Sequence, residues 1–246
     1  MILANVRQRL GRGDAQLVLR LIARGSAEEY DRAEGALRDD GIDALLDDPR
    51  LLGALIESPQ GAHASFPLFA YVVVRHALRR AGETDRVLAD YAAAILVHFG
   101  LRDAAHRVGA SDDEVYTTLT DLLRDVESGD ARRSFLVRAH LGNYALWLSG
   151  LFPDWIEHRR QRRGGPDLEY YEEMGAHGYR LAADHRLANE HGLAPLFSHA
   201  ATRFARLRAA LNVVSDRMMF PNHHTPDRLM RQVRDDFRFR RPQSPS

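Results

Sequence analysis

Cysteine and lysine are both missing from this chain of 246 residues, so all 34 of its basic residues are arginine. Without cysteine the protein has no disulfide, no thiolate metal site, no iron–sulfur cluster and no cysteine nucleophile. Without lysine, Schiff-base catalysis and the phosphate-loop lysine are excluded as well. A genome rich in G and C favours arginine over lysine, so codon usage is the simpler explanation of this bias.

Long hydrophobic runs and net charge are lacking too. The longest nearly uncharged stretches, 61–74, 87–100 and 139–153, fall short of the roughly 20 residues that cross a bilayer. Arg7 and Arg9 occur near the N-terminus with no apolar run of signal-peptide length before them. The formal net charge of zero argues against nucleic acid as a partner of the whole chain. We therefore expect a cytoplasmic protein without a membrane span.

Alternating apolar patterns typical of β-strands are scarce, whereas helix signals are plentiful. Ser26 with Glu29, and Ser111 with Glu114, have the spacing of capping boxes. Gly41 follows a periodic segment, as a C-terminal cap does. The pattern predicts an all-α bundle of about ten helices. The expected helices lie near residues 2–11, 14–24, 27–39, 42–47, 49–57, 66–81, 85–99, 112–127, 131–150, 153–163, 166–186 and 194–217.

Hydrophobicity divides the chain into three expected parts. Segments 66–78 and 135–152 are apolar around most of their circumference, which predicts that they form the centre of the bundle. We expect a main helical bundle over 66–220 and an N-terminal helical annex over 1–57 that packs on it. A tail rich in proline and arginine follows over 221–246, and part of it has the pattern of one more short helix.

Polar residues interrupt the apolar segment 131–150, at His140, Asn143 and Tyr144. Buried polar groups must find partners or cost about 1–3 kcal/mol each. One interpretation is a hydrogen-bond network that holds helices together. The alternative is a small-ligand pocket, or an acid–base site in which His140 titrates. Other central segments offer further candidates for the same region: Tyr71, His76, Tyr91 and His98.

A basic run follows Trp155 and ends the predicted helix 153–163. Cations at a helix C-terminus are favourable for stability alone, because they oppose the helix dipole. The functional alternative is contact with an acidic partner surface or with phosphates. The candidate residues for a partner surface are Trp155, Arg159, Arg160, Arg162 and Arg163. A second mixture of arginine and aromatic residues closes the tail, at Arg234, Phe237, Arg238, Phe239, Arg240 and Arg241.

A stripe of acidic residues and histidine, Glu169, Glu173 and His177, has the spacing of a helical metal site. On a helical wheel these side chains lie opposite Tyr171 and its apolar neighbours. A solvated face with ion pairs along the helix is therefore the preferred interpretation, and a metal site is a weak alternative. The adjacent pair His223–His224 would bind a metal only with a third ligand held nearby.

No familiar catalytic, nucleotide-binding or zinc-binding motif occurs in the sequence, which indicates no cofactor. Two main hypotheses remain, and the two basic clusters keep nucleic-acid binding as a third possibility. The first is a helical protein–protein interaction or scaffold module whose partner is another protein or a second copy of itself. The second is a metal- or small-ligand-binding helical enzyme, similar in kind to haem oxygenases or ferritins, with an internal pocket at His140, Asn143 and Tyr144.

Overall fold

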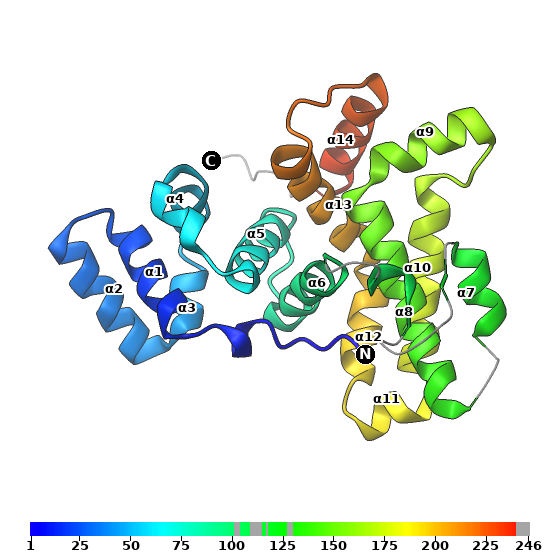
Figure 1. The fold of residues 1–246 in the computed structure, drawn as a ribbon, viewed down its shortest axis with the longest axis horizontal. Coiled ribbons are helices and arrows are strands. Elements are labelled where there is room, and N and C mark those ends of the chain that lie inside the picture. Colours follow the sequence, from blue (N-terminus) through cyan, green and yellow to red (C-terminus); the bar gives the residue numbers. More distant parts are fainter. Residues whose placement is uncertain (101–103, 109–114, 117, 127–129, 240–246) are drawn as a thin grey trace.

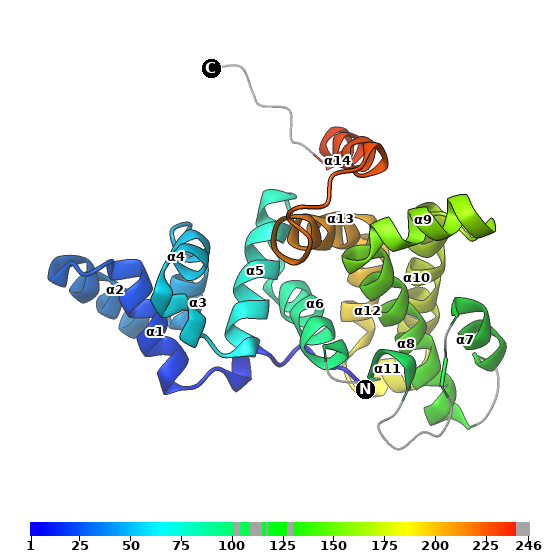
Figure 2. The same cartoon turned by 45° about the horizontal axis from the view of Figure 1, so that its top comes forward.

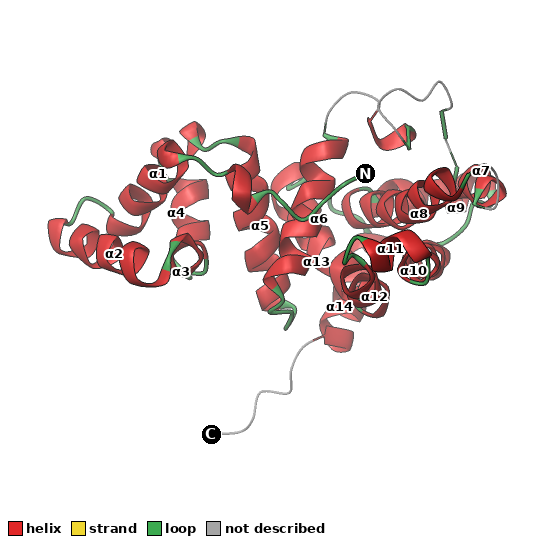
Figure 3. Ribbon diagram, turned by 90° about the horizontal axis from the view of Figure 1, so that it is seen from below, coloured by secondary structure: helices red, strands yellow, loops and turns green. Residues whose placement is uncertain are grey.

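The computed structural model describes residues 1–100, 104–108, 115–116, 118–126 and 130–239. Within these residues it contains fourteen α-helices and no strand, which confirms the all-α prediction (Figure 3). The helices are α1 (Arg12–Ala23), α2 (Ala27–Asp40), α3 (Ile42–Leu46), α4 (Leu51–Glu57), α5 (Phe66–Arg80), α6 (Arg86–Phe99), α7 (Leu119–Asp125), α8 (Ala131–Leu151), α9 (Pro153–Arg163), α10 (Leu168–Ala183), α11 (Arg186–Glu190), α12 (Ala194–Thr202), α13 (Phe204–Val214) and α14 (Pro226–Phe239). In the searched residues, none of these helices has the length and hydrophobicity to cross a membrane.

The helices form an elongated array (Figures 1 and 2). Helices α1–α4 gather at one end, α5, α6 and α13 lie in the middle, and α7–α12 form the other end. The helix α14 lies on the side of α9 and α13. The two segments expected at the centre are buried over most of their length in α5 and α8.

The helices α8 and α10 pack closely, and two glycines make this close approach possible. A Cβ atom added at Gly178 would lie 2.8 Å from the backbone nitrogen of Gly142. A Cβ atom at Gly142 would lie 2.4 Å from the ring of Tyr179. Because side chains at these two positions would force the helices apart, the glycines fix the depth at which α10 packs on α8.

Residues 2–11 do not form the predicted helix, and that prediction was wrong. The segment contains only a short 3₁₀ turn at Arg7–Arg9. The backbone N–H of Arg7 donates to Asp90 Oδ1 at 3.0 Å, and its guanidinium donates to Asp43 at 2.6 Å. These contacts with distant residues replace the hydrogen bonds of a helix, so the segment runs as a strap across the neighbouring helices.

The predicted helix 194–217 is divided in the structure. It breaks at Arg203 between α12 and α13 and ends in a π-helical turn at Ser215–Met219. The hydroxyl of Thr202 bonds back to the carbonyl oxygen of Ser198 at 2.9 Å, a contact that bends helices. In the predicted helix 112–127, the described residues Val115, Tyr116 and Thr118 are not helical, and the helix α7 covers Leu119–Asp125. The proposed capping box at Ser111 and Glu114 lies outside the described residues.

The segment after Pro221 contains the helix α14, which buries arginines instead of apolar side chains. Arg228 and Arg231 are 3% and 5% exposed. Arg228 Nε donates to Asp154 Oδ2 at 3.0 Å, and Arg231 Nη2 donates to Asp216 Oδ1 at 3.0 Å. The helix is thus held on the bundle through ion pairs. Arg240 and Arg241, at the end of the tail, lie outside the described residues.

Candidate functional site

The junction between α8 and α9 is a sharp bend fixed by Pro153 and Asn212. Proline has no backbone N–H, so the carbonyl oxygen of Ser149, four residues earlier, receives no helical hydrogen bond from it. Asn212 Nδ2 on α13 donates to that oxygen at 2.7 Å and to the carbonyl oxygen of Gly150 at 2.8 Å. Ser215 donates to the carbonyl oxygen of Leu151 at 2.6 Å. The last carbonyl groups of α8 therefore have hydrogen-bond partners, and these bonds fix the direction of α9 relative to α8.

Asp154, in the first turn of α9, anchors this bend to α14. Its carboxylate accepts from Arg228 and from Arg231 Nη2, the latter at 3.2 Å. Burial alone would raise the pKa of Asp154, but the hydrogen bond from Arg228 and the charge of Arg231 outweigh it and lower the pKa below its usual range. A carboxylate at a helix N-terminus also opposes the helix dipole.

A groove of about 720 Å³ lies between α8 and α9. We call it the α8–α9 groove. Its wall on the α8 side is aromatic: the rings of Tyr144 and Trp147 stack at 6.1 Å, and Phe152 meets Trp147 edge-on at 4.9 Å. Leu148, Thr118 and His106 complete this side. Such a wall offers flat apolar surface for a ligand.

The α9 side of the groove is cationic. The lining residues there are Trp155, His158, Arg159, Arg162 and Arg163. The Arg159 guanidinium lies 5.2 Å from the centroid of the Trp155 ring, a cation–π arrangement. Among the described residues, no carboxylate lies within ion-pairing distance of Arg159, Arg162 or Arg163. None of the described residues that line the groove is acidic.

Arg160 differs from the other three arginines of the run. It does not line the groove, and its Nε donates to Glu157 Oε2 at 2.9 Å on the exposed surface of α9. The structure therefore separates the predicted partner surface into two parts. Trp155 and three arginines face the groove, while Arg160 is paired elsewhere.

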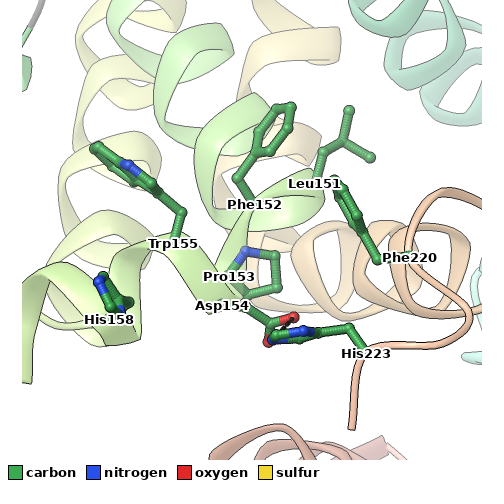
Figure 4. Close-up of a pocket in the computed structure, with 8 residues that line it drawn as sticks. All are labelled: Leu151, Phe152, Pro153, Asp154, Trp155, His158, Phe220 and His223. Atoms are coloured by element: carbon green, nitrogen blue, oxygen red, sulfur yellow. Dashed lines mark ion pairs between the residues drawn. The ribbon is translucent and has the colours of Figure 1, made fainter. Parts of the chain in front are cut away.

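A second cavity, of about 370 Å³, adjoins the groove and shares Phe152, Trp155 and His158 with it (Figure 4). Its other side is formed by Phe220 and His223. The His223 ring lies beside the Asp154 carboxylate, with 3.8 Å between Nε2 and Oδ2. The two hollows thus form one furrow on either side of Trp155 and His158.

Of the predicted internal pocket, Asn143 is part of a closed hydrogen-bond network. Its Oδ1 accepts from the hydroxyls of Tyr91 at 2.6 Å and of Tyr179 at 2.9 Å. Burial raises the pKa of both tyrosines well above the usual value, so both stay protonated donors. These contacts join α6, α8 and α10 in the core, and Asn143 does not line the groove.

His140 is likewise turned into the protein. Its Nε2 lies 3.0 Å from the carbonyl oxygen of Ala105, which identifies this nitrogen as the protonated donor. Burial lowers the pKa of His140 to about 4, so the ring is neutral near pH 7. It stacks on Tyr144, with 6.1 Å between ring centroids. Tyr144 is the residue of the predicted pocket that reaches the groove, and burial raises its pKa to about 12.

Tyr71 and His76 belong to another part of the protein. Both lie on α5 and face the N-terminal part of the chain: the Tyr71 ring is 5.8 Å from the Arg7 guanidinium, and His76 Nε2 is 3.1 Å from the carbonyl oxygen of Leu46. The structure does not bring them to His140. His98, by contrast, is close to Phe99, whose ring contacts that of His140.

The stripe of Glu169, Glu173 and His177 lies on α10, with both glutamates exposed and His177 half-buried. Tyr171, on the opposite side of the wheel, is buried as expected. In the searched residues there is no group of three acidic or histidine side chains placed to hold a metal ion.

Sequence reasoning missed Trp147 and Phe152 as site residues. They lie in a segment apolar all round, which predicts core packing, and Trp147 is in fact half-buried. The available signal was the recurrence of aromatic residues at 144, 147, 152 and 155, on both sides of Pro153. The last of these aromatic residues is followed closely by the run of arginines in the sequence.

The comparisons with known proteins add no family to this picture. No protein-family model matches the chain, and neither a curated protein nor a solved structure shows significant similarity to it.

Proposed function

We propose that this protein is a cytoplasmic interaction module that binds an acidic, partly apolar segment of another protein in the α8–α9 groove. The observation that carries the proposal is the meeting of two features in one place. An aromatic wall with Tyr144, Trp147 and Phe152 stands opposite three arginines that have no carboxylate partner among the described residues.

The chemistry of the groove favours a carboxylate-bearing ligand. A guanidinium group binds a carboxylate through two parallel hydrogen bonds, and such charge-assisted bonds are stronger than neutral ones. The chain as a whole carries no net charge, so the attraction is local to this surface. Apolar side chains of the ligand would rest on the aromatic wall, where flat rings contribute much of the binding energy at protein interfaces.

The shape of the site supports a peptide segment over a compact small molecule. The groove opens to the surface and continues past Trp155 into the adjoining cavity, whose described lining includes Phe220 and His223. The interior polar groups His140 and Asn143 are already bonded within the protein. The furrow therefore fits an extended segment that crosses Trp155.

Intrinsic fluorescence tests the proposal directly, because Trp147 and Trp155 are the two tryptophans of the chain and both line the groove. A short peptide of alternating glutamate and leucine, without tryptophan, should change the emission and saturate. The same peptide with glutamine in place of glutamate should bind far more weakly. Binding should weaken several-fold as salt is raised towards molar concentration, since exposed charges are screened.

Arg160 supplies a matched control on the same helix. Arg159→Gln and Arg162→Gln should each weaken peptide binding roughly tenfold, the loss of one charge-assisted contact. Arg160→Gln removes the same charge without touching the groove and should leave binding unchanged. Equal losses of affinity in all three variants would rule out the groove as the binding site of the peptide. If the protein bound a single-stranded oligonucleotide more tightly than the peptide, the partner would be a nucleic acid and not a protein.

A further inference from the structure

The cavity beside the α8–α9 groove has a mostly apolar lining, and we call it the Phe220 cavity. Leu151, Phe152, Pro153 and Phe220 supply apolar surface, and the volume is about 370 Å³. Two of its aromatic side chains, those of Trp155 and Phe220, are 46% and 41% exposed, so they are open to a ligand. Pockets of this kind at protein interfaces hold a single large anchor side chain of the partner.

A row of aromatic rings connects the groove with the Phe220 cavity. The centroid of the Trp147 ring lies 6.1 Å from that of Tyr144 and 4.9 Å from that of Phe152. The centroid of the Phe220 ring lies 6.2 Å from that of Phe152. Because the row has no large gap, one ligand can contact aromatic surface from the groove into the cavity.

Charge, by contrast, differs between the two hollows. Three arginines of α9 line the groove, whereas the described lining of the Phe220 cavity includes no arginine and contains the carboxylate of Asp154. Arg228 and Arg231 bind this carboxylate from α14, but neither of them lines the cavity. A ligand carboxylate in the cavity would lie near a like charge, which is unfavourable. The acidic residues of a ligand therefore belong in the groove, and an apolar residue belongs in the cavity.

The helix α9 sets the distance between these two parts. Trp155, Arg159 and Arg162 are four and three residues apart, which places them on one face of the helix. At about 1.5 Å per residue, Arg159 and Arg162 lie about 6 and 10 Å from Trp155 along the helix axis. An extended peptide covers these distances with about two to three residues. Since the cavity begins on the far side of Trp155, its occupant lies about one residue further from the arginines.

We infer that the Phe220 cavity binds one bulky apolar side chain of the acidic segment, about two to four residues away from the carboxylates that meet the arginines of α9. The inference rests on the proposed function and specifies its ligand: an anchor residue such as phenylalanine or leucine beside a short acidic run. The distances along α9 are the same for both directions of the ligand chain, so the anchor can precede or follow the acidic run.

Four peptides, titrated against the tryptophan fluorescence of the full chain, test the inference. The first carries one phenylalanine and three glutamates that begin two residues after it, in a background of serine and glycine, and the second has the reverse order. The third is the tighter of these two with alanine in place of phenylalanine. The fourth moves the phenylalanine eight residues away from the glutamates.

The tighter of the first two peptides should bind at least tenfold more tightly than its alanine form. It should bind several-fold more tightly than the peptide with the distant phenylalanine, because a long flexible linker holds the anchor less effectively near its pocket. Equal affinity of the tighter peptide and its alanine form would overturn this inference and leave the proposed function standing. Absence of binding by all four peptides would overturn both.

Phe220→Ala is the matching change in the protein. It should remove most of the advantage of the phenylalanine peptide and leave the affinity for the alanine form unchanged. The carbonyl oxygen of Phe220 accepts from Arg228 Nη1 at 2.8 Å, and alanine keeps this bond, so the variant should retain wild-type circular dichroism. Phe237→Ala removes an exposed phenylalanine that lines neither hollow and should bind both peptides like wild type. An undiminished preference for phenylalanine in Phe220→Ala would contradict the inference.

Discussion

Helices α9 and α14 contact each other, both are rich in arginine, and they use it in opposite ways. In α14, Arg228 and Arg231 are buried and reach the carboxylates of Asp154 and Asp216. In α9, Arg159, Arg162 and Arg163 line an open groove without such partners among the described residues. The number of arginines in a helix therefore says little about their role. The position of the carboxylates decides whether an arginine stabilises the fold or remains available for a ligand.

The strongest test of this contrast is removal of one buried arginine. Arg231→Met should lower the free energy of unfolding by about 2–3 kcal/mol, because the buried Asp216 loses its charge-assisted bonds from Arg231 and keeps the bond from Gln232 and the ion pair with Arg228. Arg162→Gln should leave the unfolding free energy unchanged within error. Urea denaturation monitored by circular dichroism measures both. Equal stability of the two variants would show that the pairs of α14 are not structural.

Acid should destabilise the bundle through His140 on α8, the helix that leads into α9. The pKa of His140 is lowered to about 4 by burial, against about 6.5 in an unfolded chain. The unfolded state then binds more protons between these values, so stability falls as the pH drops from 6.5 to 4. The full loss attributable to His140 is on the order of 3 kcal/mol.

His140→Gln provides the control for this pH dependence, since glutamine keeps an amide donor for the carbonyl oxygen of Ala105 but does not titrate. Urea midpoints across the pH range should vary less in the variant than in the wild type. Part of the dependence should remain, because burial also lowers the pKa of His76 and of His98. An unchanged pH profile would show that His140 does not determine acid sensitivity.

Added salt should affect the arginines of α9 and those of α14 differently, and we expect this effect to be smaller than those of Arg231→Met and of acid. Peptide binding at the exposed arginines of α9 should weaken several-fold as salt is raised towards molar concentration, because screening acts on exposed charges. The buried pairs of α14 are screened much less, so the thermal midpoint should change little. Fluorescence titration and thermal melts in the same buffers compare them. A large fall of the midpoint with salt would place the α14 pairs among exposed contacts.

The smallest expected effect is that of Arg160→Gln. The side chain is exposed and pairs with Glu157 on its own helix, and such pairs contribute little. Neither the peptide affinity nor the thermal midpoint should change measurably. A clear effect would extend the cationic surface of α9 beyond the groove.

The sequence predicts the all-α fold, the buried segments of α5 and α8 and the apolar face of α10, because these follow from periodicity within each helix. It does not predict the strap at residues 2–11, since the contacts of Arg7 with Asp43 and Asp90 join residues far apart in the chain. The orientation of α14 cannot be predicted from the sequence for the same reason. A helical wheel predicts that the apolar face of α14 packs inward, but the contacts of Arg228 and Arg231 with Asp154 and Asp216 place the polar face inward.

Some parts of the candidate site were predictable from the sequence, but Trp147, Phe152 and the combination of the parts were not. Tyr144 and the arginines of α9 stand out separately, one as a buried polar group and the others as a charged run. Their meeting depends on the bend at Pro153, which is held by Asn212 more than fifty residues later in the chain. The burial of His140 without access to the groove depends on its hydrogen bond to the carbonyl oxygen of Ala105, which belongs to another segment.

The bend at Pro153 has an evolutionary consequence. Asn212 is needed where it is because a proline has removed the N–H that would otherwise bond to the Ser149 carbonyl oxygen. The bond from Asn212 to Ser149 is therefore needed only while Pro153 is present, whereas the bond that Asn212 accepts from Arg208 is independent of the proline. In a set of orthologues, we expect position 212 to vary more in lineages that have replaced the proline than in lineages that keep it.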